Sequence, residues 1–279
     1  MKIIEYDAAT AISRSSMAEL DYALNAYAGC SHGCIYCYAM DFTRIKEAAS
    51  QWGQVVYVKR NLLQLLRSEI KSMKRGIVGV STVTDPYQPA ESIYHLSGSA
   101  IGILLSSGFR VTVQTKSPLV TRDSDIFMDH RNSCDVGVTI TTMDMKKALI
   151  LEPQSPSPKA RTRALSVLSN RGIRTWIFLG PIIRGINDSL EDMNPIFQAA
   201  AETGSRLIYD TFSQYRGAMG MMEEKMGAFG TLWRKGSDPR WQERVEADIQ
   251  RLSDRYSVKC NSQEQEWLEE KKMDFKTLY

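Results

Sequence analysis

Short apolar runs alternate along the chain with longer amphipathic segments. The runs are rich in β-branched and aromatic residues, and each ends in polar residues or a turn, as buried strands do. They occupy residues 24–29, 76–85, 110–117, 135–142, 174–183 and 206–212. Because helical patterns separate them, they predict a parallel sheet, either doubly wound or curved into part of a β/α barrel.

Capping residues predict where the intervening helices begin. Ser157 followed by Pro158 has the pattern of an N-cap and a first helical residue. A second helix is expected to begin at Asn187 or Asp188, and Pro195 predicts a kink or an interruption within it.

The pattern changes beyond Phe212. Residues 217–230 hold four methionines and four glycines, which predicts no regular helix and suits either a substrate lid or packing against the sheet. Asp238 is expected to cap a helix over residues 237–257. The charged tail, residues 264–279, is also predicted to be helical.

Composition bounds the class of protein. The chain has 279 residues, 43% of them hydrophobic and 24% charged, which suits a globular protein with a sizeable core. A net charge of +3 is compatible with an anionic partner but neither implies nor excludes nucleic acid. The chain shows no signal-peptide pattern, no uncharged membrane-spanning run and no secreted disulfide framework, so we expect a cytoplasmic protein without membrane contact.

Polar residues collect where the predicted strands end. They are Thr84 and Asp85, Thr115 and Lys116, residues 139–142, and Asp210 with Thr211. The carboxyl ends of parallel strands share one edge of a sheet, and both candidate architectures place their active sites there. We therefore expect a site at this edge, close to a cysteine-rich loop that also follows a predicted strand.

That loop holds Cys30, Cys34 and Cys37 in the spacing C-x3-C-x2-C. A structural zinc site needs four ligands, so His32 or a distant cysteine would have to complete it. A buried cluster of unreactive thiols is a second alternative, although the flanking residues are typical of a loop. An iron–sulfur cubane normally takes four cysteines, so three would leave one iron open to another ligand.

The pattern C-x3-C-x-aromatic-C, with Tyr36 as the aromatic residue, resembles the signature of the radical S-adenosylmethionine (radical SAM) superfamily. The resemblance implies that the three cysteines bind a [4Fe–4S] cluster whose open iron chelates S-adenosylmethionine. It also implies reductive cleavage of that cofactor to a 5′-deoxyadenosyl radical, which abstracts hydrogen from a substrate.

Within this superfamily the sequence is similar to the spore photoproduct lyase-like branch. The loop CSHGCIYCYA places Tyr36 and Tyr38 on the two tyrosines of that branch, and the segments TVTDPYQPAE, VQTKSPLVTRD, TITTMD, LEPQSPSPKAR and PIIRGIND follow in its order. The similarity spans about residues 22–212. It implies an α/β fold with a partial (β/α)6 TIM-type barrel over residues 1–215, and a helical C-terminal extension over residues 216–279 packed on the barrel.

The resemblance implies cofactor contacts in these segments. Ile183 and Asp188 belong to a segment expected to lie against the adenine, although Asp188 is equally suited to cap a helix. Together the implied cofactor-binding residues are Tyr36, Thr84, Lys116, Glu152, Ile183 and Asp188.

Catalytic positions are implied at Tyr38, Thr82 and Glu91. Thr82 stands where spore photoproduct lyase has a hydrogen-donating cysteine. A threonine O–H bond is too strong for that role, so we do not expect thymine-dimer repair. Arg161, early in a predicted helix, is expected either in the site or on a solvated face.

Two other classes of function stay open. One is a nucleic-acid repair or modification enzyme of the same chemistry, which salt-sensitive binding would support. The other is a non-catalytic zinc or iron–sulfur protein. For the radical enzyme we expect a reducing partner such as flavodoxin or ferredoxin, and the resemblance leaves open the substrate and the choice between lyase and transferase.

Overall fold

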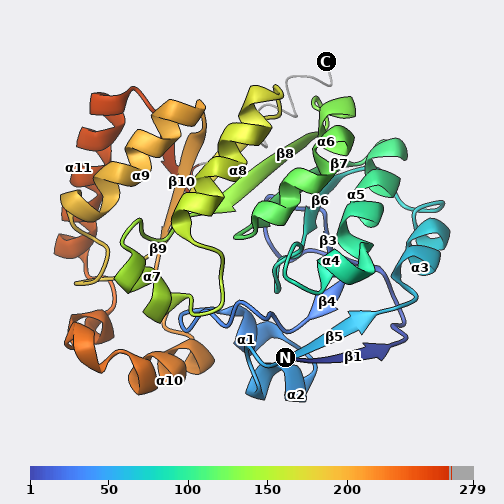
Figure 1. Cartoon of the computed structure of the whole chain (residues 1–279), viewed down its shortest axis with the longest axis horizontal. Helices are drawn as coiled ribbons and strands as arrows, with labels where there is room; N and C mark the ends of the chain where they lie inside the picture. Colours follow the sequence, from blue (N-terminus) through green and yellow to red (C-terminus); the bar gives the residue numbers. More distant parts are fainter. Residues whose placement is uncertain (264, 266–279) are drawn as a thin grey trace.

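The centre of the computed structural model, which describes residues 1–263 and 265, is an eight-stranded sheet (Figure 1). The strand order is β11-β10-β9-β8-β7-β6-β3-β2, and every neighbouring pair is parallel except β2 with β3. The bounds are β2 (Ile12–Arg14), β3 (Tyr22–Leu24), β6 (Ile77–Val80), β7 (Arg110–Thr115), β8 (Cys134–Thr139), β9 (Thr175–Ile182), β10 (Arg206–Thr211) and β11 (Cys260–Ser262). Strands β3 and β6 to β10 alternate with helices, which confirms the predicted α/β fold and fits a partial barrel.

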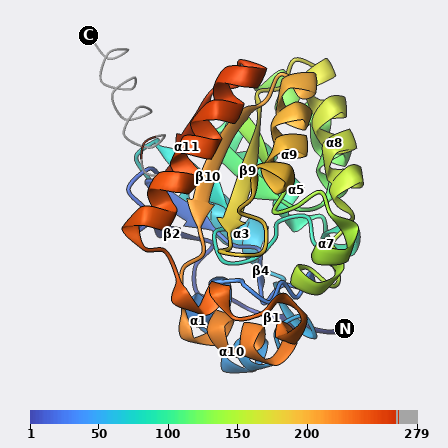
Figure 2. The ribbon, with the colours of Figure 1, turned by 90° about the vertical axis from the view of Figure 1, so that its left-hand side faces the viewer.

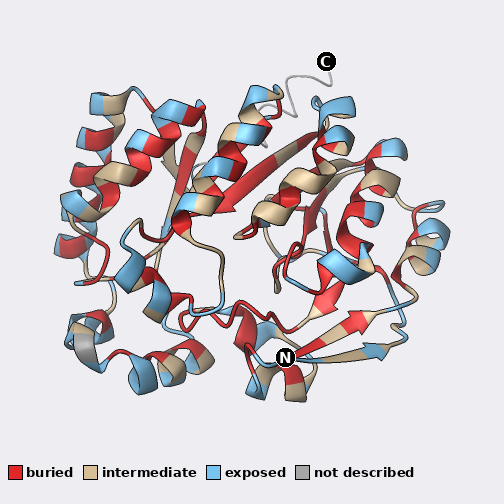
Figure 3. Cartoon of the chain, viewed as in Figure 1, coloured by how far each residue is buried: buried red, intermediate tan, exposed pale blue. Residues whose placement is uncertain are grey.

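Helices cover the outer face of this sheet. Figures 1 and 2 show them around it, and Figure 3 shows the buried residues on the strands and on the sides of the helices that face the sheet. None of the described helices combines the length and the apolar character that a membrane span needs. The helical segments are α1 (Ala39–Phe42), α2 (Lys46–Ser50), α3 (Leu62–Glu69), α4 (Glu91–Tyr94), α5 (Leu96–Ser106), η1 (Pro118–Asp123), α6 (Ser124–Asp129), α7 (Met145–Leu151), α8 (Pro158–Asn170), α9 (Leu190–Thr203), α10 (Arg216–Lys225), η2 (Gly227–Phe229), η3 (Leu232–Lys235) and α11 (Pro239–Tyr256).

A second, three-stranded sheet corrects the prediction of one strand over residues 24–29. It consists of β1 (Lys2–Tyr6), β5 (Val55–Lys59) and β4 (Tyr27–Ala28), in the order β1-β5-β4. The predicted run therefore divides, since Leu24 ends a strand of the main sheet and Tyr27 begins one in the small sheet. Asn25 lies at the division, where its side-chain oxygen accepts a hydrogen bond from the backbone of Val83 at 3.1 Å. This contact, between residues distant in sequence, holds the chain where it passes from β3 to β4.

Side-chain caps explain where the helices begin. Ser157 accepts the backbone N–H of Ala160 at the start of α8, as predicted. For α9 the prediction of Asn187 or Asp188 is wrong, because Ser189 is the N-cap and accepts the backbone N–H of Asp192. The helix continues through Pro195, so the interruption expected there does not occur.

Replacing Ser189 with alanine is expected to lower the free energy of unfolding by about 1 kcal/mol, because α9 loses the acceptor that caps its first turn. Chemical denaturation of both proteins measures this difference. Ser166→Ala is the control, since that hydroxyl lies inside α8 and bonds only a helical carbonyl, and its effect should be within about 0.5 kcal/mol. Equal losses in the two variants would contradict the capping role.

The part of the chain beyond residue 215 contains more order than its composition predicted. Residues 216–225 form α10, although the run of methionine and glycine indicated no regular helix. Helix α11 begins at the predicted cap, Asp238, and packs on α9. Strand β11 adds to the main sheet beside β10, so the expected helical extension also contributes a strand. The predicted helix over 264–279 lies outside the described residues.

Candidate functional site

The cysteine loop lies at the edge of the sheet where the parallel strands end. It follows β4 and leads into α1, and α10 packs against α1 below the arrowheads of β9 and β10 (Figure 2). Cys30 and Cys34 are buried and Cys37 is half-buried, and all three are free thiols. This position agrees with the strand-end location expected from the sequence.

Two glycines allow the loop its shape. Gly29 has φ +80° and faces the carbonyl oxygen of Val55, which any Cβ atom would strike. Gly33 has φ +61°, and a Cβ atom added to it would lie 3.3 Å from the Cα atom of Gly53. A side chain at Gly29 would therefore force the loop away from β5, and one at Gly33 would be strained by the positive φ.

The loop chemistry fits an iron–sulfur cluster better than a zinc ion. Among residues 1–263 and 265, no three cysteine, histidine or carboxylate side chains converge on one metal-ion position. A closed zinc site requires four such ligands around one ion. In a [4Fe–4S] cubane each thiolate binds a different iron, so the cysteine sulfurs surround the whole cluster, which is larger than a single metal ion. The three thiols are close enough to influence one another electrostatically, as ligands of one cluster would be.

A buried polar network borders the loop. Glu152 accepts hydrogen bonds from Tyr36, Thr141 and Arg161, and it forms an ion pair with Arg161. Burial alone would raise the pKa of Glu152, but Arg161 and Lys116 hold it at about 2, so the carboxylate is ionised. The ammonium of Lys116 lies 5.5 Å from the centroid of the Tyr36 ring. Burial alone would lower the pKa of Lys116, but negative charge at Cys34 and Glu152 raises it above its usual value.

Arg161 therefore lies inside the protein and not on a solvated face. Its side chain is about 1% exposed, and it donates to the carbonyls of Thr139 and Pro156 in addition to Glu152. Burial of a guanidinium costs free energy unless a carboxylate and acceptors surround it. The partner comes from the segment before α8, so the sequence position of Arg161 alone gave no indication of this contact.

His32, a candidate zinc ligand in the sequence, is buried beside Asp85 in the structure. The imidazole Nδ1 lies 3.4 Å from the carboxylate of Asp85, and both side chains are almost fully buried. Burial alone would raise the pKa of Asp85. His32, the hydroxyl of Thr115 and the backbone N–H of Lys116 instead lower this pKa to about 2. Asp85 thus connects the cysteine loop to the end of β7.

Thr84 bonds the start of the loop. Its hydroxyl donates to the carbonyl of Gly29 at 2.6 Å, directly before Cys30. Gln88, which sequence reasoning missed, bonds both Thr84 and the backbone of Ser31. Gln88 is fully buried and lies four residues after Thr84. Its polar side chain close to a predicted strand end could have indicated a role in the site.

Glu91, expected as a catalytic position, takes part in a buried hydrogen-bond network. It is fully buried, and its carboxylate accepts from Tyr27, from Arg122, and from the backbone N–H groups of Ser97 and Gly98 at the start of α5. Both oxygens are occupied by these donors.

Asp188 takes part in packing and is not the N-cap of α9. Its carboxylate accepts from the backbone of Gly185 at 2.9 Å, from Trp241 at 2.6 Å and from Arg244. These bonds attach α11 to the connection between β9 and α9. Ile183 in the same connection is fully buried in the apolar cluster around the cysteine loop, as a cofactor-contacting position would be.

Tyr38 and Thr82 lie together at the mouth of the sheet. The Tyr38 hydroxyl donates to the carbonyl oxygen of Thr82 at 2.5 Å, and the Tyr38 ring remains 42% exposed. Tyr38, which follows Cys37 in sequence, is therefore open to solvent, and Thr82 is half-buried.

The sequence model of the radical SAM superfamily matches residues 24–194, which is more than half of the chain and includes the cysteine loop. The chain belongs to the radical SAM superfamily. Radical SAM proteins bind an iron–sulfur cluster and S-adenosylmethionine, and the three thiols described above fit that pair. The finer roles of the surrounding residues remain proposals.

Relatives of this radical SAM protein include uncharacterized and named members. An uncharacterized protein of Methanocaldococcus jannaschii is 33% identical over 188 residues, which is 67% of this chain and 70% of that protein. An uncharacterized protein of Acidianus two-tailed virus is 29% identical over 207 residues, 70% of this chain and 68% of the viral protein. A radical SAM Nalpha-GlyT isomerase of Pseudomonas phage M6 is 21% identical over 90% of this chain and 52% of the isomerase.

A solved structure shares the fold. Spore photoproduct lyase complexed with dinucleoside spore photoproduct superposes with a TM-score of 0.73, covering 94% of this chain and 81% of the lyase. The sequence identity is 16%, so the likeness concerns the fold alone.

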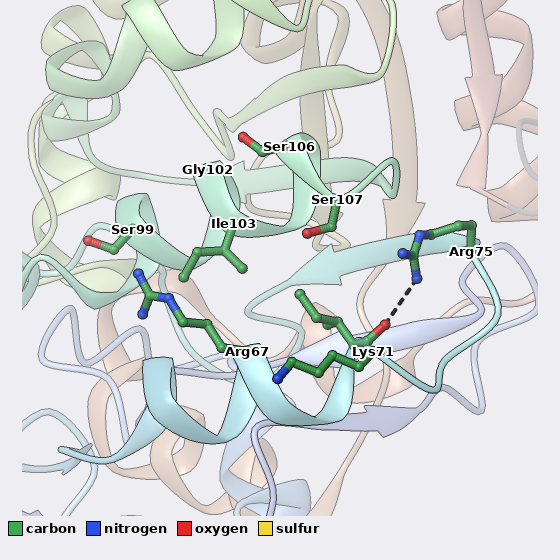
Figure 4. Close-up of a pocket in the computed structure, with 9 residues that line it drawn as sticks. Arg67, Lys71, Arg75, Ser99, Gly102, Ile103, Ser106 and Ser107 are labelled. Atoms are coloured by element: carbon green, nitrogen blue, oxygen red, sulfur yellow. Dashed lines mark hydrogen bonds between the residues drawn. The ribbon is translucent and has the colours of Figure 1, made fainter.

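A wide hollow lies away from the predicted site residues, between α3 and α5 (Figure 4). It has a volume of 790 Å³, and we call it the α3–α5 groove. Its lining includes three cations and three serines but no carboxylate: Arg67, Lys71, Arg75, Ser99, Ser106 and Ser107. Arg75 is used locally, since it bonds the carbonyls of Ile70 and Met73.

Proposed function

We propose that this chain binds a [4Fe–4S] cluster through Cys30, Cys34 and Cys37, cleaves S-adenosylmethionine reductively, and abstracts hydrogen from a substrate. The observation that carries the proposal is the set of three free thiols on one glycine-shaped loop at the strand ends. Zinc would require a fourth ligand at the same ion. A cubane with three thiolates leaves one iron for the cofactor.

The residues around the loop would order the reaction. When bound, the cluster supplies the electron that breaks the sulfonium C–S bond and yields a 5′-deoxyadenosyl radical. Burial raises the pKa of the Cys34 thiol, and the positive charge of Lys116 beside it opposes that rise. Glu152 accepts hydrogen bonds from the Tyr36 hydroxyl and from Arg161, so it fixes the positions of both side chains. The apolar cluster around the loop excludes water from the radical.

Anaerobic reconstitution with iron and sulfide tests this proposal. The protein, reduced with dithionite and mixed with S-adenosylmethionine, is expected to form 5′-deoxyadenosine, which chromatography measures. Flavodoxin or ferredoxin replaces dithionite in a second reaction to test the proposed partner. Purified protein that holds one zinc and no iron, and forms no deoxyadenosine after reconstitution, would overturn the proposal.

Nucleic-acid modification by the same chemistry is the second candidate. The observation that favours it is the α3–α5 groove, whose lining carries three cations and no carboxylate. Arg67 and Lys71 are exposed, and no ion pair involves them among the residues that the structure describes. Such side chains are suited to phosphate contacts, which give affinity without sequence information. The structural likeness to a lyase with a bound dinucleoside supports the same candidate.

For this candidate, replacing both Arg67 and Lys71 with glutamine is expected to reduce the salt dependence of DNA binding. For duplex DNA, each phosphate contact adds about 0.9 to the magnitude of the slope of log K against log salt. The double variant loses two contacts, so the magnitude of its slope should be smaller by about 2. Fluorescence anisotropy across a salt series measures the slope. Lys159→Gln with Arg163→Gln, on the exposed side of α8, is the matched control and should change nothing. Absence of binding at low salt would reject the candidate.

A further inference from the structure

The inner face of the main sheet, opposite the helices, is open to solvent at its centre. Strands β7, β8 and β9 lie side by side there (Figure 1). On their outer face Val113, Val138 and Leu179 are at most 1% exposed and belong to the apolar clusters of the core. Successive side chains of a strand point to opposite faces, so Gln114 and Phe178 lie on the inner face. Gln114 is exposed and Phe178 is half-buried, so solvent reaches this face.

The pairing of the strands brings these two side chains together. The Nε2 atom of Gln114 donates a hydrogen bond to the hydroxyl of Thr139 at 3.0 Å. Thr139 is also the residue of β8 that pairs with Phe178 of β9. Because neighbouring strands are only about 4.8 Å apart, the amide of Gln114 and the side chain of Phe178 both adjoin Thr139. A hydrogen-bonding amide and an aromatic ring therefore share one place on the inner face.

Two glycines seat the aromatic rings of β9 against the sheet. A Cβ atom at Gly137 would lie 2.2 Å from the indole of Trp176, and one at Gly180 would lie 2.3 Å from the ring of Phe178. Asp135 also holds Trp176, because its carboxylate accepts the indole N–H at 2.8 Å. Trp176 is only 7% exposed and fills the inner face near the start of β9. The open part of the face therefore lies further along the strand, at Phe178.

This open part adjoins the cysteine loop. Two residues after Gln114, the ammonium of Lys116 lies 5.5 Å from the centroid of the Tyr36 ring. Two residues after Thr139, the hydroxyl of Thr141 lies 2.9 Å from the hydroxyl of Tyr36. Two residues of extended chain span at most about 7 Å. A group bound between Gln114 and the ring of β9 would therefore lie close to the loop assigned to the cluster.

The free groups of Gln114 match the edge of a nucleobase. Its Nε2 atom carries a second N–H, and its Oε1 atom accepts no hydrogen bond within the part of the chain that the structure describes. The amide thus offers a donor and an acceptor side by side, which is the pair that glutamine uses to recognise a base. The ring of Phe178 offers a surface for stacking. Enzymes that act on a base hold it in these two ways after they extrude it from its strand.

We propose that Gln114 and Phe178 form a subsite for a nucleobase of the substrate, which stacks on the ring of Phe178 and pairs with the amide of Gln114. This proposal rests on the proposed function and deepens its second candidate, because it names the part of a nucleic acid that reaches the cysteine loop. The carboxylate of Asp135 on the same face disfavours a phosphate there. Only the neutral base is therefore expected to enter.

Fluorescence anisotropy with the full, anaerobically reconstituted chain tests the subsite. The probes are three fluorescein-labelled single-stranded decamers: oligothymidylate, oligodeoxyadenylate and an abasic strand of tetrahydrofuran phosphates. The abasic strand has the same charge as the other two but no base. Both base-containing strands should bind about tenfold more tightly than the abasic strand, because stacking and edge pairing act on bases alone.

Substitutions at the two positions test whether this preference for bases arises at the subsite. Phe178→Leu should reduce the preference about fivefold, because it removes the stacking surface, and Phe178→Tyr should restore it. Gln114→Leu should also reduce it about fivefold, because it removes the edge contacts. Gln250→Leu is the matched control, since this exposed glutamine on α11 bonds only Asp254, and it should leave the preference unchanged.

Equal binding of the abasic and base-containing strands, or absence of binding at low salt, would overturn the proposal. So would an unchanged preference in both Phe178→Leu and Gln114→Leu with iron content and circular dichroism intact. Failure of the proposed radical chemistry is distinguishable, because the same preparation would then prefer bases but form no deoxyadenosine. Deoxyadenosine formation without a preference for bases would reject the subsite alone.

Discussion

Replacing Cys34 with alanine is expected to abolish the iron–sulfur cluster and with it all formation of 5′-deoxyadenosine. Cys34 is the central cysteine of the loop and the proposed ligand, and its thiol is buried near Cys30, Lys116 and Ser155, none of which can supply the sulfur that the substitution removes. Two thiolates do not hold a cubane that already has one open iron. Iron and sulfide analysis, visible absorbance and chromatography measure the loss.

Cys134→Ala is the matched control for that variant. Cys134 is equally buried, but it begins β8 at the opposite end of the strand and its thiol donates to the carbonyls of Phe127 and His130. The control should keep its full iron content. Retention of a complete cluster by Cys34→Ala, or loss of it in Cys134→Ala, would contradict the assignment of the loop.

Replacing Glu152 with glutamine is expected to lower the free energy of unfolding by about 3–5 kcal/mol, because it leaves the buried guanidinium of Arg161 without its counter-charge. Both side chains are about 1% exposed, so solvent does not compensate for the loss. Equilibrium denaturation with guanidinium chloride measures the difference. Asp125→Asn is the control, since its pair with Arg171 is exposed and should contribute less than about 1 kcal/mol.

The same carboxylate predicts how stability depends on pH. The pKa of Glu152 falls from 4.5 to about 2 on folding, which corresponds to about 3 kcal/mol of stability present above pH 4.5. A group with a lowered folded pKa loses this contribution as the pH falls toward 2. Wild type should therefore lose more stability over this interval than Glu152→Gln. Parallel stability curves for the two proteins would contradict an ionised Glu152 in the fold.

Local patterns were enough to predict the elements that short-range forces decide. Ser157 and Asp238 begin α8 and α11 as predicted, because an N-cap bonds a backbone group three residues away. The boundary of α9 was wrong by one or two residues, because three consecutive residues, Asn187, Asp188 and Ser189, are all capping types. Contacts with Trp241 and Arg244 occupy Asp188 and leave the cap to Ser189.

In the candidate site, too, the sequence indicated some residues and only the fold distinguished others. The spacing of the three cysteines, with Tyr36 between the last two, lies within eight residues and was readable from the sequence as a radical SAM loop. Glu91 and Glu152 looked alike, since each carboxylate lies in a polar segment after a predicted strand. Only the fold distinguishes them, because Glu91 is occupied by the start of α5 and Glu152 borders the cysteine loop.

The sequence by itself determined the alternation of strands and helices, the cysteine loop and the family, because each depends on residues close together in the chain. The tertiary structure decided the division of residues 24–29 between two sheets and the burial of Arg161. These features depend on contacts between residues that are distant in sequence, and the energy of such contacts is defined only once the whole sheet has assembled.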